Sequence, residues 1–433
     1  MSDRMIDQLL AGTLPDPDGG APLRVATRSV AILPTLKKVE ADFVKPLGLG
    51  RRLAVVSDAT THGVLGARVA RALESLGQVS SILLPGRPHP DVETVEKIRK
   101  ASASADALVA VGSGTINDLC KYASAQDRKP YIVFATAPSM NGYTSVNAAI
   151  TDHGHKKSLA AQAPLAAFFD LDVLTASPPR MIRSGLGDSL CRPTAQADWM
   201  LAHLLLDQPY RTMPFVLLED DEAQLFAESD ALMRGDMEAM RCLVRTLLLS
   251  GFGTAIYGSS HPASQGEHLI SHYADMFGDH GWPESFHGEQ IGVTTLTMAR
   301  LQERLLEGPA PTVHVNGADE TAFTTKYGPE LGKSCWKEFA QKRLDAARAK
   351  AVNQRLADSW DKIREAIARI TIPANTLRDV LQRAAAPMQP EDLGWPRQFY
   401  LTAVKQAREI RSRYTFLDLA SDSGKIEPVA ALT

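Results

Sequence analysis

The chain has 433 residues, 44% of them hydrophobic and 22% charged, and a formal net charge of −3. This length exceeds the size at which one hydrophobic core usually stops growing, so we expect a globular protein of two domains. The small net charge argues against nucleic acid or an acidic membrane surface as the main partner, and no apolar stretch reaches the roughly 18 residues of a membrane helix. Four scattered cysteines are expected to be free thiols in a reducing cytoplasm.

Predicted strands alternate with predicted helices from residue 51 to about residue 178. Strands are expected at residues 52–58, 79–84, 107–111 and 130–135, with helical spacing of apolar residues between them, including residues 91–103. This alternation is typical of βαβ units in a parallel, Rossmann-like sheet. Right-handed crossovers place the C-terminal ends of all the strands, and a bound ligand, at one edge of the sheet.

Two loops at that edge are candidates for dinucleotide binding. The first contains Gly112, Gly114, Thr115, Ile116, Asn117 and Asp118, and it opens a helix whose N–H groups suit a phosphate. Asn117 stands where the dinucleotide fingerprint has its third glycine, so a glycine turn needed only for packing is the alternative. The second contains Thr136, Ala137, Pro138, Ser139, Asn141 and Ser145. Its hydroxyl and amide groups suit a ribose and a nicotinamide, and polar turn chemistry is the alternative.

Five of the eleven histidines lie within residues 258–288, at positions 261, 268, 272, 280 and 287. His268 and His272 are four residues apart and share one face of a helix, while Pro283 prevents the same helix from reaching His287. Imidazoles from two segments suit a zinc-like ion, which takes about four N, O or S ligands. The alternative is a set of surface and loop histidines. Asp188, in the first turn of a predicted helix, would supply a carboxylate, or it is simply a helix cap.

Helical periodicity dominates beyond residue 178. Helices are expected at residues 187–207, 219–232, 236–256, 264–277, 288–306, 333–369, 374–386 and 396–413. We therefore predict an α/β dinucleotide-binding domain over residues 1–178, followed by an all-helical domain over residues 179–433 that binds metal and substrate. The cleft between two such domains is the natural place for a site.

Six motifs together resemble the iron-containing alcohol dehydrogenase and dehydroquinate synthase-like superfamily, and within it the sn-glycerol-1-phosphate dehydrogenase family. They lie at residues 112–118, 136–145, 185–188, 266–272, 286–288 and 411–420. They occur in the family's order and span roughly residues 50–420. The Asp/His/His set is shared across the superfamily, whereas the combination of Gly185-Leu-Gly-Asp188, Glu267-His-Leu-Ile-Ser-His272 and His287-Gly288 is more specific to this branch.

The resemblance implies an oxidoreductase that transfers hydride between NAD(P)H and dihydroxyacetone phosphate, in phospholipid metabolism. It implies one divalent metal ion, zinc before nickel or iron(II), on Asp188, His268 and His287, and a catalytic group of Asp188, His272 and Asn141. Asp58 would hold the adenosine ribose and favour NAD over NADP, although Arg87 would soften that preference. The two loops would line the cofactor through Gly112, Gly114, Thr115, Ile116, Asn117, Asp118, Thr136, Ala137, Pro138, Ser139 and Ser145. A phosphorylated or polyol substrate and a homodimer or larger homo-oligomer are implied as well.

Two departures from the family pattern bear on the substrate. Asn141 replaces the usual aspartate, and an amide cannot accept a proton as a carboxylate does. The segment 191–193, Cys-Arg-Pro, also differs. Three alternatives therefore stay open: a metal-dependent polyol or glycerol dehydrogenase, a sugar-phosphate cyclase of the dehydroquinate synthase kind, and a non-catalytic nucleotide-binding protein. The cyclase usually has glutamate in place of Asp188.

Overall fold

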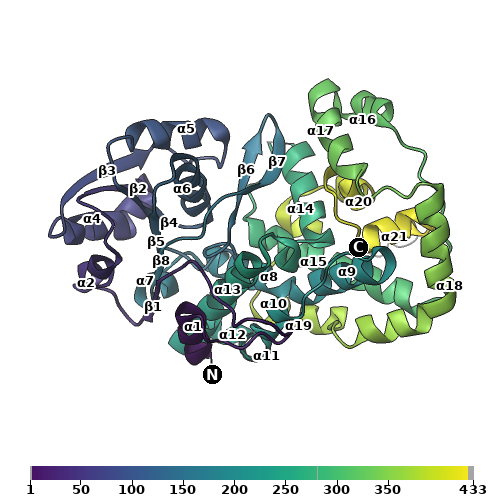
Figure 1. Ribbon diagram of the computed structural model, residues 1–433, viewed down its shortest axis with the longest axis horizontal. Coiled ribbons are helices and arrows are strands. Elements are labelled where there is room, and N and C mark those ends of the chain that lie inside the picture. The colour runs from purple at the N-terminus through teal and green to yellow at the C-terminus, as the bar shows by residue number, and fades with distance from the viewer. Residues whose placement is uncertain (1, 280, 428–433) are drawn as a thin grey trace. The chain divides into compact units, whose positions relative to one another are not determined.

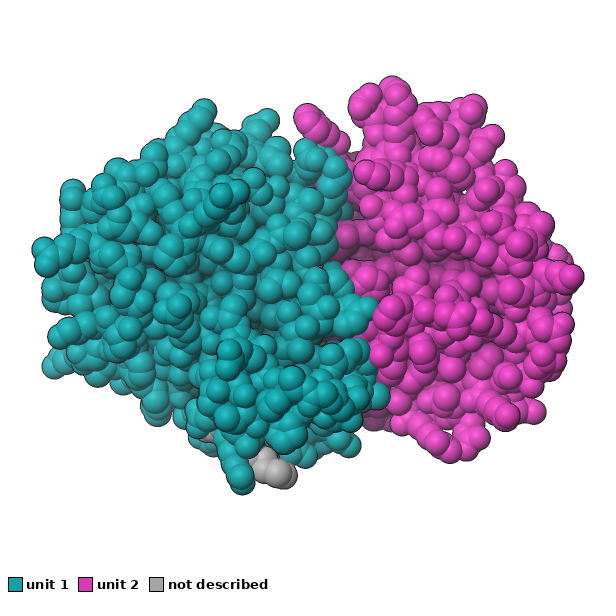
Figure 2. Space-filling view, in the orientation of Figure 1, with its two compact units in different colours: residues 1–152, 156–189, 211–260 teal, residues 153–155, 190–210, 261–433 magenta. Residues whose placement is uncertain are grey.

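The computed structural model describes residues 2–279 and 281–427 (Figure 1). The chain forms two compact units (Figure 2). Unit 1 comprises residues 1–152, 156–189 and 211–260, and unit 2 comprises residues 153–155, 190–210 and 261–433. These units do not follow a single division at residue 178, because residues 179–189 and 211–260 group with the sheet. The assignment of residues 1–178 to dinucleotide binding stays a prediction.

Unit 1 contains a six-stranded parallel sheet, which confirms the predicted fold class. Its strands are β1 (Ser29–Leu33), β2 (Arg52–Asp58), β3 (Gln78–Leu84), β4 (Ala107–Gly112), β5 (Tyr131–Ala135) and β8 (Ala166–Asp170), in the order β1-β8-β5-β4-β2-β3. Each of the four predicted strands agrees with the structure to within one residue at either end. The sequence analysis did not predict β1, β8 or the separate two-stranded ribbon of β6 (Asn147–Asp152) and β7 (His155–Ala160).

Helices cover both faces of this sheet because its central strands are apolar on both sides. On one face Leu53, Val55, Val109 and Val111 pack in one core with the helices α2 (Glu40–Val44) and α4 (Ala67–Leu73). The alternate residues of β2 and β4 point the other way, toward α6 (Gly114–Asp127), which packs beside α5 (Val92–Ala101).

The order of the strands reverses at β2, which lies between β3 and β4. Crossovers that diverge from one strand leave a crevice at its C-terminal end, where ligands bind in open α/β sheets. Asp58 ends β2 and Gly112 ends β4, so two of the predicted cofactor segments flank this point.

Helices complete unit 1. They are α1 (Ser2–Ala11), α3 (Ala59–Thr61), α7 (Leu171–Thr175), α8 (Pro179–Leu190, of which Leu190 belongs to unit 2), α10 (Met213–Val216), α11 (Glu219–Ala227), α12 (Ser229–Met233) and α13 (Met237–Tyr257). Helix α13 is long and apolar enough to cross a membrane, a feature that the sequence analysis did not predict. Because 72% of its most apolar stretch is buried inside the structure, α13 is a core helix.

Unit 2 is built around one hydrophobic core shared by its helices. The helices that contribute to it are α9 (Arg192–Leu206), α14 (Gly266–Phe277), α15 (His287–Glu307), α16 (Glu320–Tyr327), α17 (Pro329–Phe339), α18 (Ala346–Ala368), α20 (Arg397–Gln406) and α21 (Phe416–Asp422). A further helix, α19 (Ala374–Arg383), packs against α15. The prediction of one helix over residues 333–369 was wrong. The chain turns between α17 and α18, where the Asp345 side chain accepts the Arg348 N–H at 2.9 Å and caps the new helix.

The single helix predicted over residues 187–207 was also wrong. Helix α8 starts earlier, at Pro179, and a break at Cys191 separates it from α9, in which Pro193 occupies the first turn. Asp188 therefore lies in the last turn of α8, and it does not have the helix-capping role that was the alternative to metal binding.

Gly185 offers a test of how α8 packs. A β-carbon at Gly185 would lie 1.7 Å from the carbonyl oxygen of Pro138. We expect Gly185→Ala to lower the free energy of unfolding by about 1–3 kcal/mol or more, because backbone atoms would have to move. Urea unfolding followed by circular dichroism measures the change.

The matched control is Gly63→Ala, whose new β-carbon would meet no atom within 4 Å. We expect this variant to stay within about 1 kcal/mol of the wild type. Equal stability of the two variants would contradict the described contact between α8 and the Pro138 loop.

Candidate functional site

The two predicted nucleotide loops lie against each other in unit 1. The Thr136 N–H donates to the Gly112 carbonyl at 3.1 Å, which continues the sheet pairing beyond the ends of β4 and β5. Met140 covers the start of α6, since a β-carbon at Gly114 would lie 3.1 Å from its Cγ. Glycine at position 114 therefore allows the second loop to lie close to the helix N-terminus.

Lys121, which the sequence analysis did not single out, ties these loops together. Its side chain is fully buried on α6. The ammonium donates to the Gly142 carbonyl at 2.6 Å, the Ser145 hydroxyl at 2.8 Å and the Asn147 carbonyl at 3.0 Å. The Asp118 carboxylate lies 3.3 Å away. Burial lowers the pKa of Lys121, and the Asp118 charge opposes that shift.

Several residues predicted to bind the cofactor hold these loops in shape. Asp118 accepts the Ala149 N–H at 3.1 Å. The Ala137 and Ser139 carbonyls accept the hydroxyls of Tyr143 (2.5 Å) and Ser184 (2.9 Å). Asn117 and Ile116 are buried, as are Thr136, Ser139 and Ser145. Contacts of Thr115, Pro138 and the other residues of this set with a cofactor stay a prediction.

Asp58 has a structural partner at the end of β2. Its carboxylate accepts the Thr61 N–H at 2.8 Å, and the Thr61 hydroxyl accepts the Asp58 N–H at 3.0 Å, which forms a capping box. The side chain is half-buried. A role at the ribose would have to use the carboxylate in this capped position.

Asn141 and Asp188 contact each other within unit 1. The Asn141 backbone N–H donates to Asp188 Oδ2 at 2.6 Å, and its side-chain amide lies 3.5 Å from the Asp188 carbonyl. Asp188 is buried on α8. The second loop thus helps to position the candidate carboxylate through its backbone, a contact that any residue except proline would also provide at position 141.

Three histidine rings converge in unit 2. The ring centroids of His268 and His272, on α14, are 5.9 Å apart, and His287, the first residue of α15, lies 5.1 Å from His268 and 5.9 Å from His272. The predicted sharing of one helix face and the arrival of His287 from a second segment are confirmed. The Ser271 hydroxyl, which donates to Gln290 at 2.6 Å, links the two helices.

Buried carboxylates surround the start of α14. Asp198, on α9, accepts the Gly266 N–H and the Phe416 N–H, both at 2.9 Å, and so joins the first residues of α14 and α21. Burial, followed by the charge of Glu267, raises the pKa of Asp198 well above its ordinary value. Glu267 itself contacts the His268 ring at 2.9 Å, a contact that sequence spacing did not indicate.

The C-terminal motif reaches the histidine cluster through Arg411, whose guanidinium lies 3.3 Å from His272 Nδ1. A buried ion-pair network anchors this segment. Lys342 and Arg408 contact the Asp418 carboxylate at 2.9 and 3.0 Å, and Arg408 contacts Asp422 at 2.8 Å. The motif of residues 411–420 is therefore positioned by tertiary charge pairing.

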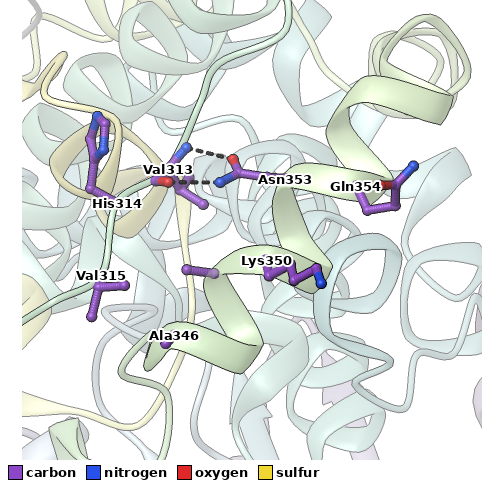
Figure 3. A pocket seen from close by; sticks show the side chains of 8 residues that line it. Val313, His314, Val315, Ala346, Lys350, Asn353 and Gln354 are labelled. Carbon is purple, nitrogen blue, oxygen red and sulfur yellow. Dashed lines mark hydrogen bonds between the residues drawn. The ribbon is translucent and has the colours of Figure 1, made fainter.

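Other features of unit 2 lie outside this cluster. His261 packs near Trp199, with ring centroids 6.2 Å apart, and burial followed by the Arg413 charge lowers the His261 pKa to about 3. His280 lies outside the described residues. Figure 3 shows a separate hollow in which the Asn353 amide pairs with both backbone groups of Val313 at 2.8 Å. No predicted site residue lines this hollow, which is formed by Val313, His314, Val315, Ala346, Ala349, Lys350, Asn353 and Gln354.

Comparison with known proteins identifies the class of protein to which this fold belongs. Residues 34–178 match the family model described as iron-containing alcohol dehydrogenase. The crystal structure of glycerol dehydrogenase from Schizosaccharomyces pombe has a similar fold, with a TM-score of 0.62 and 16% identity over 94% of this chain and 90% of that one. The fold is that of the iron-containing alcohol dehydrogenases.

Sequence relatives define the family. A glycerol-1-phosphate dehydrogenase [NAD(P)+] from Thermococcus kodakarensis is 33% identical over 306 residues, which are 70% of this chain and 86% of the relative. A protein of the same name from Halalkalibacterium halodurans is 34% identical over 256 residues, 58% of this chain and 64% of the relative's length. This chain belongs to the glycerol-1-phosphate dehydrogenase family.

Lys121 supplies a prediction for the loops. Lys121→Met removes three hydrogen bonds and leaves Asp118 without its ammonium partner, so we expect a loss of about 3–5 kcal/mol in the free energy of unfolding. We also expect NADH to bind at least about tenfold more weakly, because the second loop loses its anchor. Chemical denaturation and NADH fluorescence titration measure these effects.

Lys97→Met, which alters an exposed lysine of α5, is the control, and its stability should stay within about 0.5 kcal/mol of the wild type. Unchanged NADH affinity in a folded Lys121→Met protein would contradict the predicted role of Lys121 in cofactor binding.

Proposed function

We propose that this protein catalyses the reversible NAD(P)H-dependent reduction of dihydroxyacetone phosphate to sn-glycerol 1-phosphate with the help of a divalent metal ion. The observation that carries the proposal is the convergence of His268, His272 and His287, in a chain of the glycerol-1-phosphate dehydrogenase family. The family supplies the reaction class, and the rings supply a place where a metal would bind.

The donor set fits a divalent ion. Asp188, His268 and His287 offer one carboxylate and two imidazoles, a combination that suits zinc, nickel and iron(II). We assign Asp188 as the third ligand because it ends Gly185-Leu-Gly-Asp188, one of the motifs that resemble the family and imply a metal site of one aspartate and two histidines. The Asn141 N–H on Oδ2 would orient the carboxylate. When bound, the ion would polarise the substrate carbonyl as a Lewis acid.

The nucleotide would lie on the loops that follow β4 and β5. The start of α6 at Gly114 offers backbone N–H groups to a pyrophosphate. Asp58, at the end of the adjacent β2, would bond the adenosine ribose and disfavour the 2′-phosphate of NADP. Hydride transfer itself is the chemistry of the nicotinamide, and the protein supplies orientation.

We assign His272 to the substrate oxygen that becomes the product hydroxyl. The Arg411 guanidinium can only donate, so His272 Nδ1 accepts this hydrogen bond and the neutral ring carries its proton on Nε2. That N–H would donate a hydrogen bond to the substrate oxygen and stabilise the negative charge that develops there during reduction, while the proton that completes the hydroxyl would come from water. The role does not require a carboxylate at position 141.

The first test combines ligand variants with a substrate panel. We expect His268→Ala, His287→Ala and Asp188→Asn each to lose bound zinc and about 10³-fold in kcat/KM for dihydroxyacetone phosphate, since metal assistance contributes several kcal/mol. Elemental analysis and NADH oxidation measure these losses. His203→Ala, which changes an exposed histidine of α9, should keep both properties.

The panel compares dihydroxyacetone phosphate, dihydroxyacetone and a dehydroquinate precursor, each with NADH and with NADPH. Steady NADH consumption with the phosphorylated ketone is the expected result. A preference for dihydroxyacetone would indicate a polyol dehydrogenase, and turnover without net NADH consumption would indicate a cyclase. Full zinc content in one ligand variant would remove that residue from the site.

Asn141→Asp tests the departure from the family pattern. We expect less than a tenfold change in kcat/KM, because the backbone N–H that holds Asp188 remains and the proposed hydrogen bond from His272 does not involve position 141. Loss of one hydrogen-bond donor to a developing negative oxygen costs about 10²–10³-fold, so His272→Ala should lose that much. Both variants are assayed with dihydroxyacetone phosphate across pH. A gain of a hundredfold in Asn141→Asp would mean that the native substrate is a different one.

A further inference from the structure

Glu267 and His268 are neighbours in the chain whose side chains also touch. Glu267 Oε1 lies 2.9 Å from His268 Nδ1, and the carboxylate is fully buried. Adjacent residues on a helix normally point in different directions. Here the contact occurs at the helix start, because α14 begins at Gly266 and the same Oε1 accepts the Gln265 N–H at 2.7 Å.

Helix α9 lies beside the other carboxylate oxygen. The Thr194 hydroxyl lies 3.4 Å from Glu267 Oε2 and 2.9 Å from the Cys191 carbonyl, and its single proton can serve either acceptor. The Gln302 amide of α15 donates to the Thr194 carbonyl at 3.0 Å, so α9, α14 and α15 all meet at this point. A buried carboxylate is stable only when such partners satisfy it, which limits Glu267 to one orientation.

This orientation determines which nitrogen of His268 is available. An ionised carboxylate only accepts hydrogen bonds, so Nδ1 carries the proton and Nε2 keeps its lone pair. We infer that Glu267 is a positioning residue that fixes the His268 tautomer and ring for metal binding through Nε2. The inference rests on the proposed function, since it takes His268 to be a ligand. Partners of this kind orient metal-binding histidines and raise their basicity.

Cys191 provides the rival explanation. Ligand atoms of Cys191, Glu267 and His268 all lie within 4.8 Å of one another, so an ion held there would make Glu267 a ligand in its own right. The contacts favour positioning. Oε1 is already engaged by Gln265 N–H and by the His268 ring at hydrogen-bonding distances, which leaves that oxygen no direction for an ion between it and Nδ1.

Zinc affinity tests the inference without any substrate. We expect Glu267→Gln to bind Zn²⁺ about 10–100-fold more weakly than the wild type in competition with a chromophoric chelator. The thermal midpoint of the metal-free variant should match that of the metal-free wild type, which a purely structural role would not allow. Glu303→Gln makes the same change on α15, where Glu303 caps α19 through the Ala374 N–H at 2.8 Å, and it should keep wild-type affinity. Should Glu267→Gln fail to fold, Glu267→Asp gives the same comparison.

Cobalt spectra separate positioning from ligation. In the Co²⁺-loaded protein we expect d–d bands that change in Glu267→Gln and no sulfur-to-cobalt charge-transfer band, and Cys191→Ser should keep its zinc affinity within about threefold. A charge-transfer band, wild-type affinity in Glu267→Gln, or wild-type affinity in His268→Ala would each overturn the inference. A protein that binds zinc but does not reduce dihydroxyacetone phosphate contradicts the proposed function, whereas the affinity ratio still decides the role of Glu267.

Discussion

Buried or largely buried carboxylates that accept backbone N–H groups hold the candidate sites of both units in shape. Asp198 accepts from Gly266 and Phe416, which brings the first residues of α14 and α21 together. Asp118 accepts from Ala149, and Asp188 accepts from Asn141. A buried charge is costly unless its hydrogen bonds are complete, so each of these contacts permits one arrangement of the chain around it.

Buried cationic side chains join segments that are distant in the sequence. In unit 1, Lys121 donates to the Gly142 and Asn147 carbonyls. In unit 2, Lys342 and Arg408 bind Asp418 of the C-terminal motif. In both cases the cationic side chains are buried, and in unit 2 the Asp418 carboxylate is buried with them. Removing one member would leave an uncompensated charge in the interior, which explains how short polar motifs far from the reacting atoms can be essential to the site.

The arrangement of Asn141 gives a physical reason for the amide at this position. Its backbone N–H already serves Asp188, and its side chain lies near the Asp188 carbonyl. A carboxylate in this place would put a second negative charge beside the proposed metal ligand and raise the cost of ionising both. An amide keeps hydrogen-bonding capacity without that repulsion. In the proposed function, the hydrogen bond to the substrate oxygen therefore comes from His272 on α14, beside Arg411.

Local patterns in the sequence were sufficient for the parallel sheet, the loops that end its strands and the helix that presents His268 and His272. These features depend on residues a few positions apart, and Pro283 alone excludes a continuous helix to His287. The residues themselves suggested Asp188 as a carboxylate beside the histidines, and the motif resemblance supplied the proposed role of Asp58 and the complete ligand set. The strands β1 and β8 were not predicted, because five-residue apolar runs do not distinguish a strand from a buried helix segment. Only the tertiary structure decided three features. They are the break between α17 and α18, the buried contacts of Lys121, and the contact of the Glu267 carboxylate with the His268 ring. Each depends on partners that are distant in sequence, or on a side-chain orientation set by such partners, and burial makes those partners obligatory.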